Sequence, residues 1–197
     1  MIAGAVGVKE RPILFSAPMV RAILDGSKTQ TRRVVKGDAL GILNLEIRPP
    51  SDPIFVEKCL YGKPGDRLWV RETFNPDWAG HGPIYKADGG SAIEAGYSRE
   101  PRWKPSIHMP RKLSRITLEI TGVRVERLKD ISEYDSLAEG IYQQQNPICY
   151  GPPTGKNCNQ YHLTPREAYK ALWESINSAE SWAANPWVWV ISFQRVS

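Results

Sequence analysis

The stretch Trp187-Val188-Trp189-Val190-Ile191-Ser192-Phe193 is aromatic or β-branched at every position except Ser192. Residues of these types favour extended backbone, and a short continuous run of them is typical of a strand in a protein core. The sequence therefore predicts a well-buried strand close to the end of the chain.

Two other segments predict strands in the first half of the chain. Residues 13–15 are a short apolar run, and residues 67–72 alternate between aliphatic side chains and larger or charged ones. The two faces of the second segment would carry Leu68 with Val70, and Trp69 with Arg71. We expect a strand there with one polar-lined face.

A further strand is expected at residues 116–125. Its apolar positions alternate up to Ile120 and continue in the opposite parity from Val123. A β-bulge at Gly122 would shift the side-chain pattern by one position and reconcile the two halves.

Capping residues predict helices at residues 16–25, 132–139 and 164–176. The third has the strongest start, because Thr164 can cap it, Pro165 suits its first turn and Glu167 completes a capping box. Gly26 and Gly140 supply the stops of the first two.

Three stretches have little periodicity and many turn residues: 37–61, 75–112 and 142–163. Prolines 49, 50 and 53 predict an irregular surface segment outside the core for the first. Aromatic residues between the turns of the second predict the wall of a binding site.

These elements indicate an α+β protein. Helices that do not alternate regularly with short strands favour a mostly antiparallel sheet or a small β-barrel with packed helices. A length of 197 residues fits one domain that buries its own core.

Composition indicates the cellular compartment and the kind of partner that we expect for the protein. No apolar run is long enough to cross a membrane, and three cysteines form an odd set in a chain that needs no disulfides. We expect a soluble, cytoplasmic monomer. A net charge of +5 is compatible with a polyanionic partner and equally with an ordinary solvated surface.

The run Asp25-Gly26-Ser27-Lys28-Thr29-Gln30-Thr31-Arg32-Arg33 carries the first candidates for chemistry. Lys28 and Thr31 offer a base and a nucleophile, and they can converge only if Lys28 belongs to the turn that leaves the preceding helix. The alternative is structural: Lys28 neutralises the negative helix end, and Thr31 suits a strand.

Glu139 is the third candidate, in the last turn of the helix expected at residues 132–139. A carboxylate there faces the negative end of the helix dipole, so helix stability does not explain it. A proton-transfer role would explain it, and so would an exposed position at the helix end.

Several motifs together resemble the ASCH domain of the PUA-like superfamily of small β-barrels. They are Lys28-Thr29-Gln30-Thr31-Arg32, Gly65-Asp66-Arg67-Leu68-Trp69-Val70, Ile131-Ser132-Glu133 through Gly140, and the closing strand. The resemblance spans residues 12–196, and the three irregular stretches correspond to insertions of the longer bacteriophage and prophage ASCH proteins. It implies a PUA-like barrel enlarged by insertions.

The resemblance also implies an activity. Short bacterial ASCH enzymes hydrolyse the acetamide of N4-acetylcytidine without a cofactor or metal. Their motif positions fall on Thr31 as the nucleophile, Lys28 as the neutral base and Glu139 as the proton relay. Lys28 would then need a lowered pKa, which burial, Arg32 and Arg33 could supply.

Side chains that could hold a modified nucleoside or nucleic acid follow from residue type. They are Arg32, Trp69, Arg71, Glu72, Tyr85, Trp103, His108, Arg111 and Arg115. Each has an alternative as a core aromatic or a surface charge. Two other functions stay open for the chain, a non-catalytic RNA or DNA binding module that accepts a modified or flipped base and a nuclease.

A zinc site could be built from Cys149, Cys158 and His162, with or without Cys59. The usual closely spaced cysteine pair is missing, so free cysteines are the better interpretation and no metal is expected.

Overall fold

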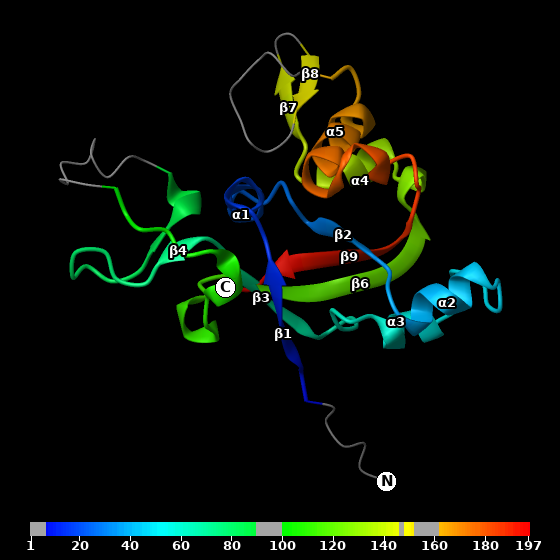
Figure 1. Ribbon diagram of the computed structural model, residues 1–197, viewed down its shortest axis with the longest axis horizontal. Helices are drawn as coiled ribbons and strands as arrows, with labels where there is room; N and C mark the ends of the chain where they lie inside the picture. The colour runs from blue at the N-terminus through cyan, green and yellow to red at the C-terminus, as the bar shows by residue number, and fades with distance from the viewer. Residues whose placement is uncertain (1–6, 90–99, 146–147, 152–161) are drawn as a thin grey trace.

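A single five-stranded sheet organises the computed structural model, which describes residues 7–89, 100–145, 148–151 and 162–197. Figure 1 shows α4 and α5 on one side of this sheet and α2 and α3 on the other side. The helices are α1 (Ala17–Leu24), α2 (Asp38–Asn44), α3 (Ile54–Lys58), α4 (Glu133–Ala138) and α5 (Pro165–Asn177). The strands of the sheet are β1 (Glu10–Leu14), β2 (Gln30–Val34), β3 (Arg67–Arg71), β6 (Thr117–Arg127) and β9 (Trp187–Arg195).

The sheet is mostly antiparallel, as the sequence predicts. Its order is β1-β3-β6-β9-β2, and only the β1–β3 pair is parallel. β1 and β2 are the two edges, and no strand ladder joins them in the described part of the chain. The protein is thus an α+β protein built on one mixed sheet.

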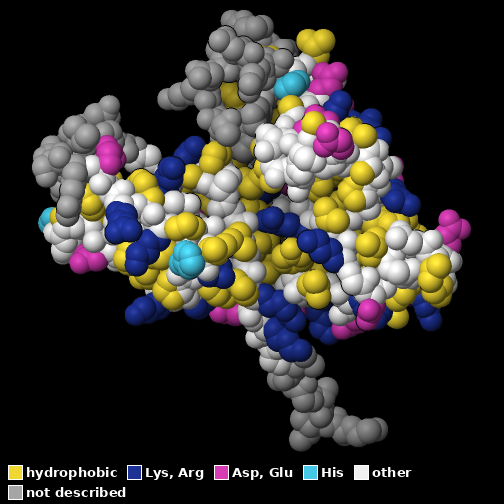
Figure 2. Space-filling model, in the orientation of Figure 1, with side chains coloured by type: hydrophobic (Ala, Val, Ile, Leu, Met, Phe, Trp, Pro, Cys, Tyr) yellow, Lys and Arg dark blue, Asp and Glu magenta, His cyan; other side chains and the backbone are white. Residues whose placement is uncertain are grey.

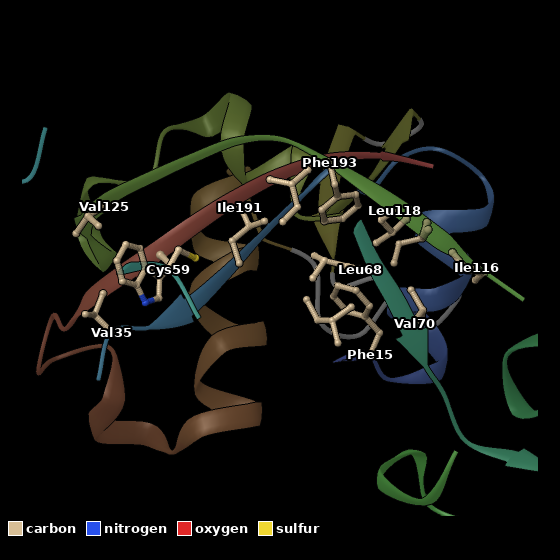
Figure 3. Close-up of a cluster of buried hydrophobic side chains, with 14 of the residues drawn as sticks. Phe15, Val35, Cys59, Leu68, Val70, Ile116, Leu118, Val125, Ile191 and Phe193 are labelled. Carbon is tan, nitrogen blue, oxygen red and sulfur yellow. The ribbon is translucent and has the colours of Figure 1, made fainter. Parts of the chain in front are cut away.

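The predicted buried strand is β9, and it separates two apolar clusters. Trp189 and Ile191 pack into the larger cluster with residues of α1, α2, α3, β3 and β6, whereas Val188 and Val190 pack against α5. Figure 3 shows the larger cluster, where Leu68, Val70, Leu118 and Ile191 project from neighbouring strands. β9 is buried on both faces because helices cover both.

The bulge expected at Gly122 is confirmed. The register of β6 against β9 shifts between Ile120 and Gly122, and Gly122 pairs with Ser192. The bulge lets Ile120 and Val125, which have opposite parity, both point into the larger cluster.

Two of the three expected helix caps are also confirmed; Ser16 stands at the N-cap position of α1 but its side chain makes no capping hydrogen bond. The Ser132 hydroxyl accepts from the Asp135 N–H at the start of α4, and the Thr164 hydroxyl accepts from the Glu167 N–H at the start of α5. Local side-chain chemistry therefore fixes where both helices begin. Gly140, just beyond α4, has a φ of 90°, a conformation that glycine adopts easily.

The expectation of an irregular, non-core segment at residues 37–61 is wrong. This segment holds α2 and α3, and Leu43, Phe55 and Cys59 are buried in the larger cluster. The prolines lie between the two helices, where they cost no helical hydrogen bond. These prolines separate the two helices and do not prevent either helix from forming.

The other two irregular stretches contain short elements. Residues 75–112 follow β4 (Phe74–Asn75) and include β5 (Ile84–Tyr85), and part of this stretch lies outside the described residues. Residues 142–163 begin with a hairpin of β7 (Tyr142–Gln145) and β8 (Ile148–Gly151). No helix in the described ranges is long and apolar enough to span a membrane.

Candidate functional site

The segment that carries Lys28 is clamped between the ends of two helices. After α1, Gly26 turns the chain with a φ of 82°, and the Lys28 N–H donates to the Ala22 carbonyl at 2.8 Å. The next N–H, of Thr29, donates to the Ala138 carbonyl at the end of α4 at 2.9 Å. These backbone bonds place Lys28 in the connection before β2, as the convergence of Lys28 and Thr31 requires.

Lys28 meets Glu139 in the protein interior. Its Nζ lies 2.7 Å from Oε2 of Glu139 and 2.8 Å from the carbonyl oxygen of the same residue. The Lys28 side chain is 0% exposed and that of Glu139 is 5% exposed. Two of the three predicted catalytic residues are therefore in direct contact, and Glu139 is not an exposed helix-end glutamate.

Burial lowers the pKa of Lys28 below its ordinary value. The Glu139 carboxylate acts in the opposite direction, and the charges of Arg33 and Arg32 lower the pKa further. Depression of the Lys28 pKa by burial and by these two arginines is what the sequence predicts. It increases the neutral fraction of the amine, the form that can accept a proton.

Thr31 points from β2 to the face on which Ile191 packs into the larger apolar cluster. Thr31 pairs with Ile191 and Arg32 with Val190, so Thr31 and Arg32 point to opposite faces. Lys28 Nζ lies 5.7 Å from the centre of the Phe15 ring, which also lies 5.3 Å from Cζ of Arg33. Arg33 has the same parity as Thr31, and the Glu139 carboxylate that Lys28 contacts is also bonded by Arg32, which points to the other face.

A pocket of about 400 Å³ adjoins these residues. Thr31 and Glu139 both line it, and Lys28, behind Glu139, does not. The remaining wall is mostly apolar or aromatic and includes Phe15, Met19, Tyr169, Leu172, Trp173 and Ile176. A volume of this size and a wall of this type are typical of a small-molecule site.

Two buried N–H groups in the pocket wall have no hydrogen-bond partner among the described residues. They are Nε1 of Trp173 and Nε of Arg33. Buried donors are normally satisfied, so unpaired donors beside a pocket favour a ligand that brings acceptor atoms. Burial and the nearby Glu139 raise the pKa of Tyr169 well above its usual value, which keeps its hydroxyl protonated.

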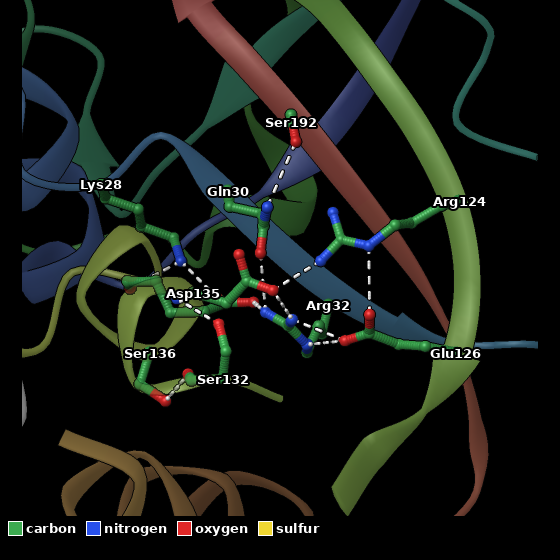
Figure 4. Close-up of polar contacts among 10 residues, drawn as sticks. Lys28, Gln30, Arg32, Arg124, Glu126, Ser132, Asp135, Ser136 and Ser192 are labelled. Atoms are coloured by element: carbon green, nitrogen blue, oxygen red, sulfur yellow. Dashed lines mark hydrogen bonds and ion pairs between the residues drawn. The ribbon is translucent and has the colours of Figure 1, made fainter. Parts of the chain in front are cut away.

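Arg32, a predicted substrate-binding residue, lines the pocket, and its guanidinium is paired with carboxylates of the protein. Its guanidinium is 0% exposed and pairs with Glu126 at 2.6 Å, Asp135 at 2.9 Å and Glu139 at 3.1 Å. It also donates to the side chain of Gln30 at 2.8 Å. Figure 4 shows Lys28, Gln30 and Arg32 reaching toward one another, with Glu126 and Arg124 approaching from β6.

Three other predicted binding residues form a second polar cluster. Arg115 makes a bidentate pair with buried Glu72, pairs with Asp88, and stacks 4.0 Å from the centre of the Tyr85 ring. The Tyr85 hydroxyl donates to the Leu113 carbonyl at 2.9 Å. Burial raises the pKa of Glu72, against the influence of Arg115. None of the three lines the pocket, and their mutual pairing favours a structural role.

The remaining predicted binding residues lie outside the pocket lining. Arg71 stacks on Trp69 and donates to the Ile107 carbonyl, while Arg111 pairs with Glu10 at 3.0 Å. Trp103 is half-buried and His108 is exposed. Arg71 and His108 are still near the site, because the 3-10 helix Ser106–His108 contributes Ser106 to the pocket wall.

The proposed zinc ligands do not assemble in the part of the chain that the structure describes. Cys59 is buried in the larger apolar cluster, Cys149 is buried in β8, and the His162 backbone pairs with Tyr150. Cys158 lies outside the described residues. No group of three potential metal ligands occurs in the described ranges.

Sequence reasoning missed the α5 side of the site. Tyr169 and Trp173 fall within the helix expected at residues 164–176 and are not among the predicted site residues, yet both line the pocket. A hydroxyl and an indole N–H on that helix were the available signal, because buried tyrosine and tryptophan usually find a partner for their polar atom. The roles of Glu126 and Asp135 depend on tertiary contacts and had no comparable signal.

No protein-family model, curated protein or solved structure matches this chain.

Proposed function

We propose that this chain is an ASCH-domain protein with a PUA-like fold, and that it is an amidohydrolase acting on N4-acetylcytidine or a related N-acylated nucleoside. The observation that carries the proposal is the buried contact between Lys28 and Glu139 beside a pocket that Thr31 also lines. The sequence resemblance gave catalytic roles to these three residues, and their proximity supports those roles.

In the proposed reaction, the Thr31 hydroxyl oxygen attacks the acyl carbonyl carbon. A neutral Lys28 accepts the hydroxyl proton, and because Lys28 lies behind Glu139, the proton passes through the Glu139 carboxylate. The carbon–nitrogen bond then breaks, and the leaving N4 amine takes this proton back from Lys28 through Glu139. Water hydrolyses the acyl ester on Thr31, so one water is consumed and one nucleoside and one carboxylic acid are released.

The pocket wall suits a nucleobase. Phe15, Tyr169 and Trp173 supply aromatic surface, and the unpaired N–H groups of Trp173 and Arg33 could donate to carbonyl or ring-nitrogen acceptors. In the described residues, the Thr31 hydroxyl has no hydrogen-bond partner, which leaves it available to a ligand.

A substrate panel tests the proposal. Purified protein is incubated with N4-acetylcytidine, longer N4-acyl cytidines and N6-acylated adenosine, and the products are separated by chromatography. We expect deacylation of at least one cytidine derivative in the absence of added metal. If every acylated nucleoside stays intact, the amidohydrolase proposal fails.

One observation favours a second function, a binding module for single-stranded nucleic acid. The Arg33 guanidinium donates to the Leu14 carbonyl, and Leu14 pairs with Arg71, which stacks on Trp69. Neither arginine pairs with a carboxylate among the described residues. Figure 2 shows Lys and Arg side chains among apolar ones across the middle of one face.

Arginines beside a half-buried aromatic ring suit phosphates and a stacked base. Binding of labelled RNA and DNA, measured at several salt concentrations, tests this function. Strong, salt-sensitive binding without hydrolysis of any nucleoside would favour the binding module over the enzyme.

A further inference from the structure

Arg32 occupies the centre of a buried ion cluster. Through Nη1 it contacts Oε1 of Glu139 at 3.1 Å, while Lys28 holds the other oxygen of the same carboxylate at 2.7 Å. Through Nη2 it contacts Glu126 and Asp135. The two oxygens of Glu139 are therefore held by two different cations.

An outer layer holds Arg32 from the other side. Arg124 on β6 pairs with Glu126 at 3.1 Å and with Asp135 at 2.5 Å, the two carboxylates that grip Arg32. Side-chain exposure increases outward along this series of ion pairs, from 0% for Arg32 to 16% for Glu126 and Asp135 and 44% for Arg124. The cluster connects the interior site to the protein surface.

We propose that Arg32 is a positioning residue that holds the Glu139 carboxylate in the orientation in which it meets Lys28, while Glu126 and Asp135 hold Arg32. The catalytic meaning of this role rests on the proposed function, but the positioning itself does not. It gives Arg32 a role that differs from the predicted contact with substrate.

The geometry explains why an arginine is needed at this position. The carboxylate of a glutamate side chain can rotate, and two donors that bond its two separate oxygens restrict that rotation. The guanidinium fork can bond several oxygens in fixed directions, whereas a lysine ammonium is a compact charge without that directional geometry. Arg32 also offsets the unfavourable field that Glu139 meets at the C-terminal end of α4.

The positive charge of Arg32 also counteracts the Glu139 carboxylate, which by itself raises the pKa of Lys28. The charged groups that face Lys28 are Glu139 after α4, and Arg32 and Arg33 on β2, with the Phe15 ring beside them. Removing Arg32 would leave the Glu139 carboxylate to Lys28 alone and would remove a positive charge. Both changes favour the ammonium form of Lys28.

Titration of Lys28 by NMR tests this inference without any substrate. The Cε and Nζ signals of isotopically labelled lysine are followed against pH in the wild type, Arg32→Met and Arg32→Lys, with Lys28→Met to assign the signal. We expect the Lys28 midpoint to rise by about 1 pH unit or more in Arg32→Met. Arg32→Lys, which keeps the charge, should stay closer to the wild type.

Arg115→Lys is the matched control, because it disturbs another bidentate pair with a buried glutamate away from Lys28. It should leave the Lys28 midpoint unchanged. Arg32→Gln serves as a second neutral variant if Arg32→Met does not fold. A folded neutral variant with the wild-type midpoint would overturn the inference.

Activity supplies an independent readout. With a substrate that the wild type hydrolyses, Arg32→Lys should lower kcat more than it raises KM, because Arg32 and Glu139 are two of the residues that line the pocket and the rest of the wall is unchanged. In Arg32→Met the rising limb of the pH–rate profile should shift to higher pH, together with the Lys28 midpoint. Absence of turnover in the wild type would reject the proposed function and leave the titration result standing.

Discussion

Lys28 Nζ lies 2.7 Å from Oε2 of Glu139, although 111 positions separate the two residues in the chain. The backbone of the Lys28 segment is bonded to the ends of both α1 and α4, so the contact forms only when these helices have packed together. The candidate site is thus a product of the tertiary fold and not of the local 25–33 run alone.

The first prediction concerns the stability of this pair. Glu139→Gln leaves a buried ammonium without its carboxylate, and removal of one partner of a buried pair costs about 3–5 kcal/mol. We expect a loss of that size in the free energy of unfolding measured with urea. Because Lys28 can lose its proton, the loss should be smaller above the lowered pKa of Lys28.

Glu57→Gln is the control for this measurement, since it removes an exposed partner of Lys63. Surface pairs contribute about 0–1 kcal/mol, so the control should stay near the wild type. Equal stability of Glu139→Gln and Glu57→Gln would contradict the buried pairing.

The second prediction concerns pH. The pKa of Lys28 is lower in the folded protein than its ordinary value of 10.5, so between these two values the unfolded chain binds more protons than the folded one. The stability contributed at Lys28 must then rise with pH across that window and level off above it. Below the folded pKa, the full cost of burying the ammonium applies.

The difference in unfolding free energy between the wild type and Lys28→Met isolates this effect, because other lysines contribute to both. We expect the wild type to gain on the variant as pH increases from neutral toward about 10.5. A difference that is flat with pH, or that falls, would show that the Lys28 pKa is not lowered.

The third prediction concerns Gly140, the residue after Glu139. Its φ is 90°, and a Cβ added there would lie 3.0 Å from Cβ of Ala22 and 3.2 Å from Cβ of Lys28. Gly140→Ala should therefore lower stability by more than about 1 kcal/mol and displace Lys28 from Glu139. Gly65→Ala has a similar φ of 89° without close neighbours and separates backbone strain from crowding.

Thermal unfolding and the Lys28 NMR signal check the third prediction together. Both glycine variants should lower the melting temperature, and only Gly140→Ala should move the Lys28 signal. An unmoved signal in Gly140→Ala would mean that the loop adapts without disturbing the site.

The parts of the fold that local chemistry determines could be predicted from sequence. The caps at Ser132 and Thr164 and the bulge at Gly122 depend on residues close in the chain, and the structure confirms all three. The helices at 38–44 and 54–58 could not be predicted, because each is too short to show a helical period and prolines lie nearby.

The site shows the same division between local and tertiary information. Lys28 and Glu139 could be identified from local patterns. Lys28 closely follows the glycine that ends one helix, and Glu139 is a carboxylate at the negative end of another, where helix stability does not explain it. The pairing of Arg32 with Glu126 and Asp135 joins positions 94 and 103 residues away, and no local pattern contains it. For the same reason, the sequence could not show that Arg115 pairs with Glu72 instead of binding a substrate.

The central claim is that Lys28, Thr31 and Glu139 hydrolyse an N-acylated nucleoside. The most direct measurement is the rate of cytidine and acetate release from N4-acetylcytidine by the wild type, Thr31→Ser, Thr31→Val and Lys28→Ala, each first shown to be folded. We predict equal release of both products by the wild type, partial activity in Thr31→Ser and background rates in the other two variants. Wild-type rates in Thr31→Val or Lys28→Ala would contradict the mechanism.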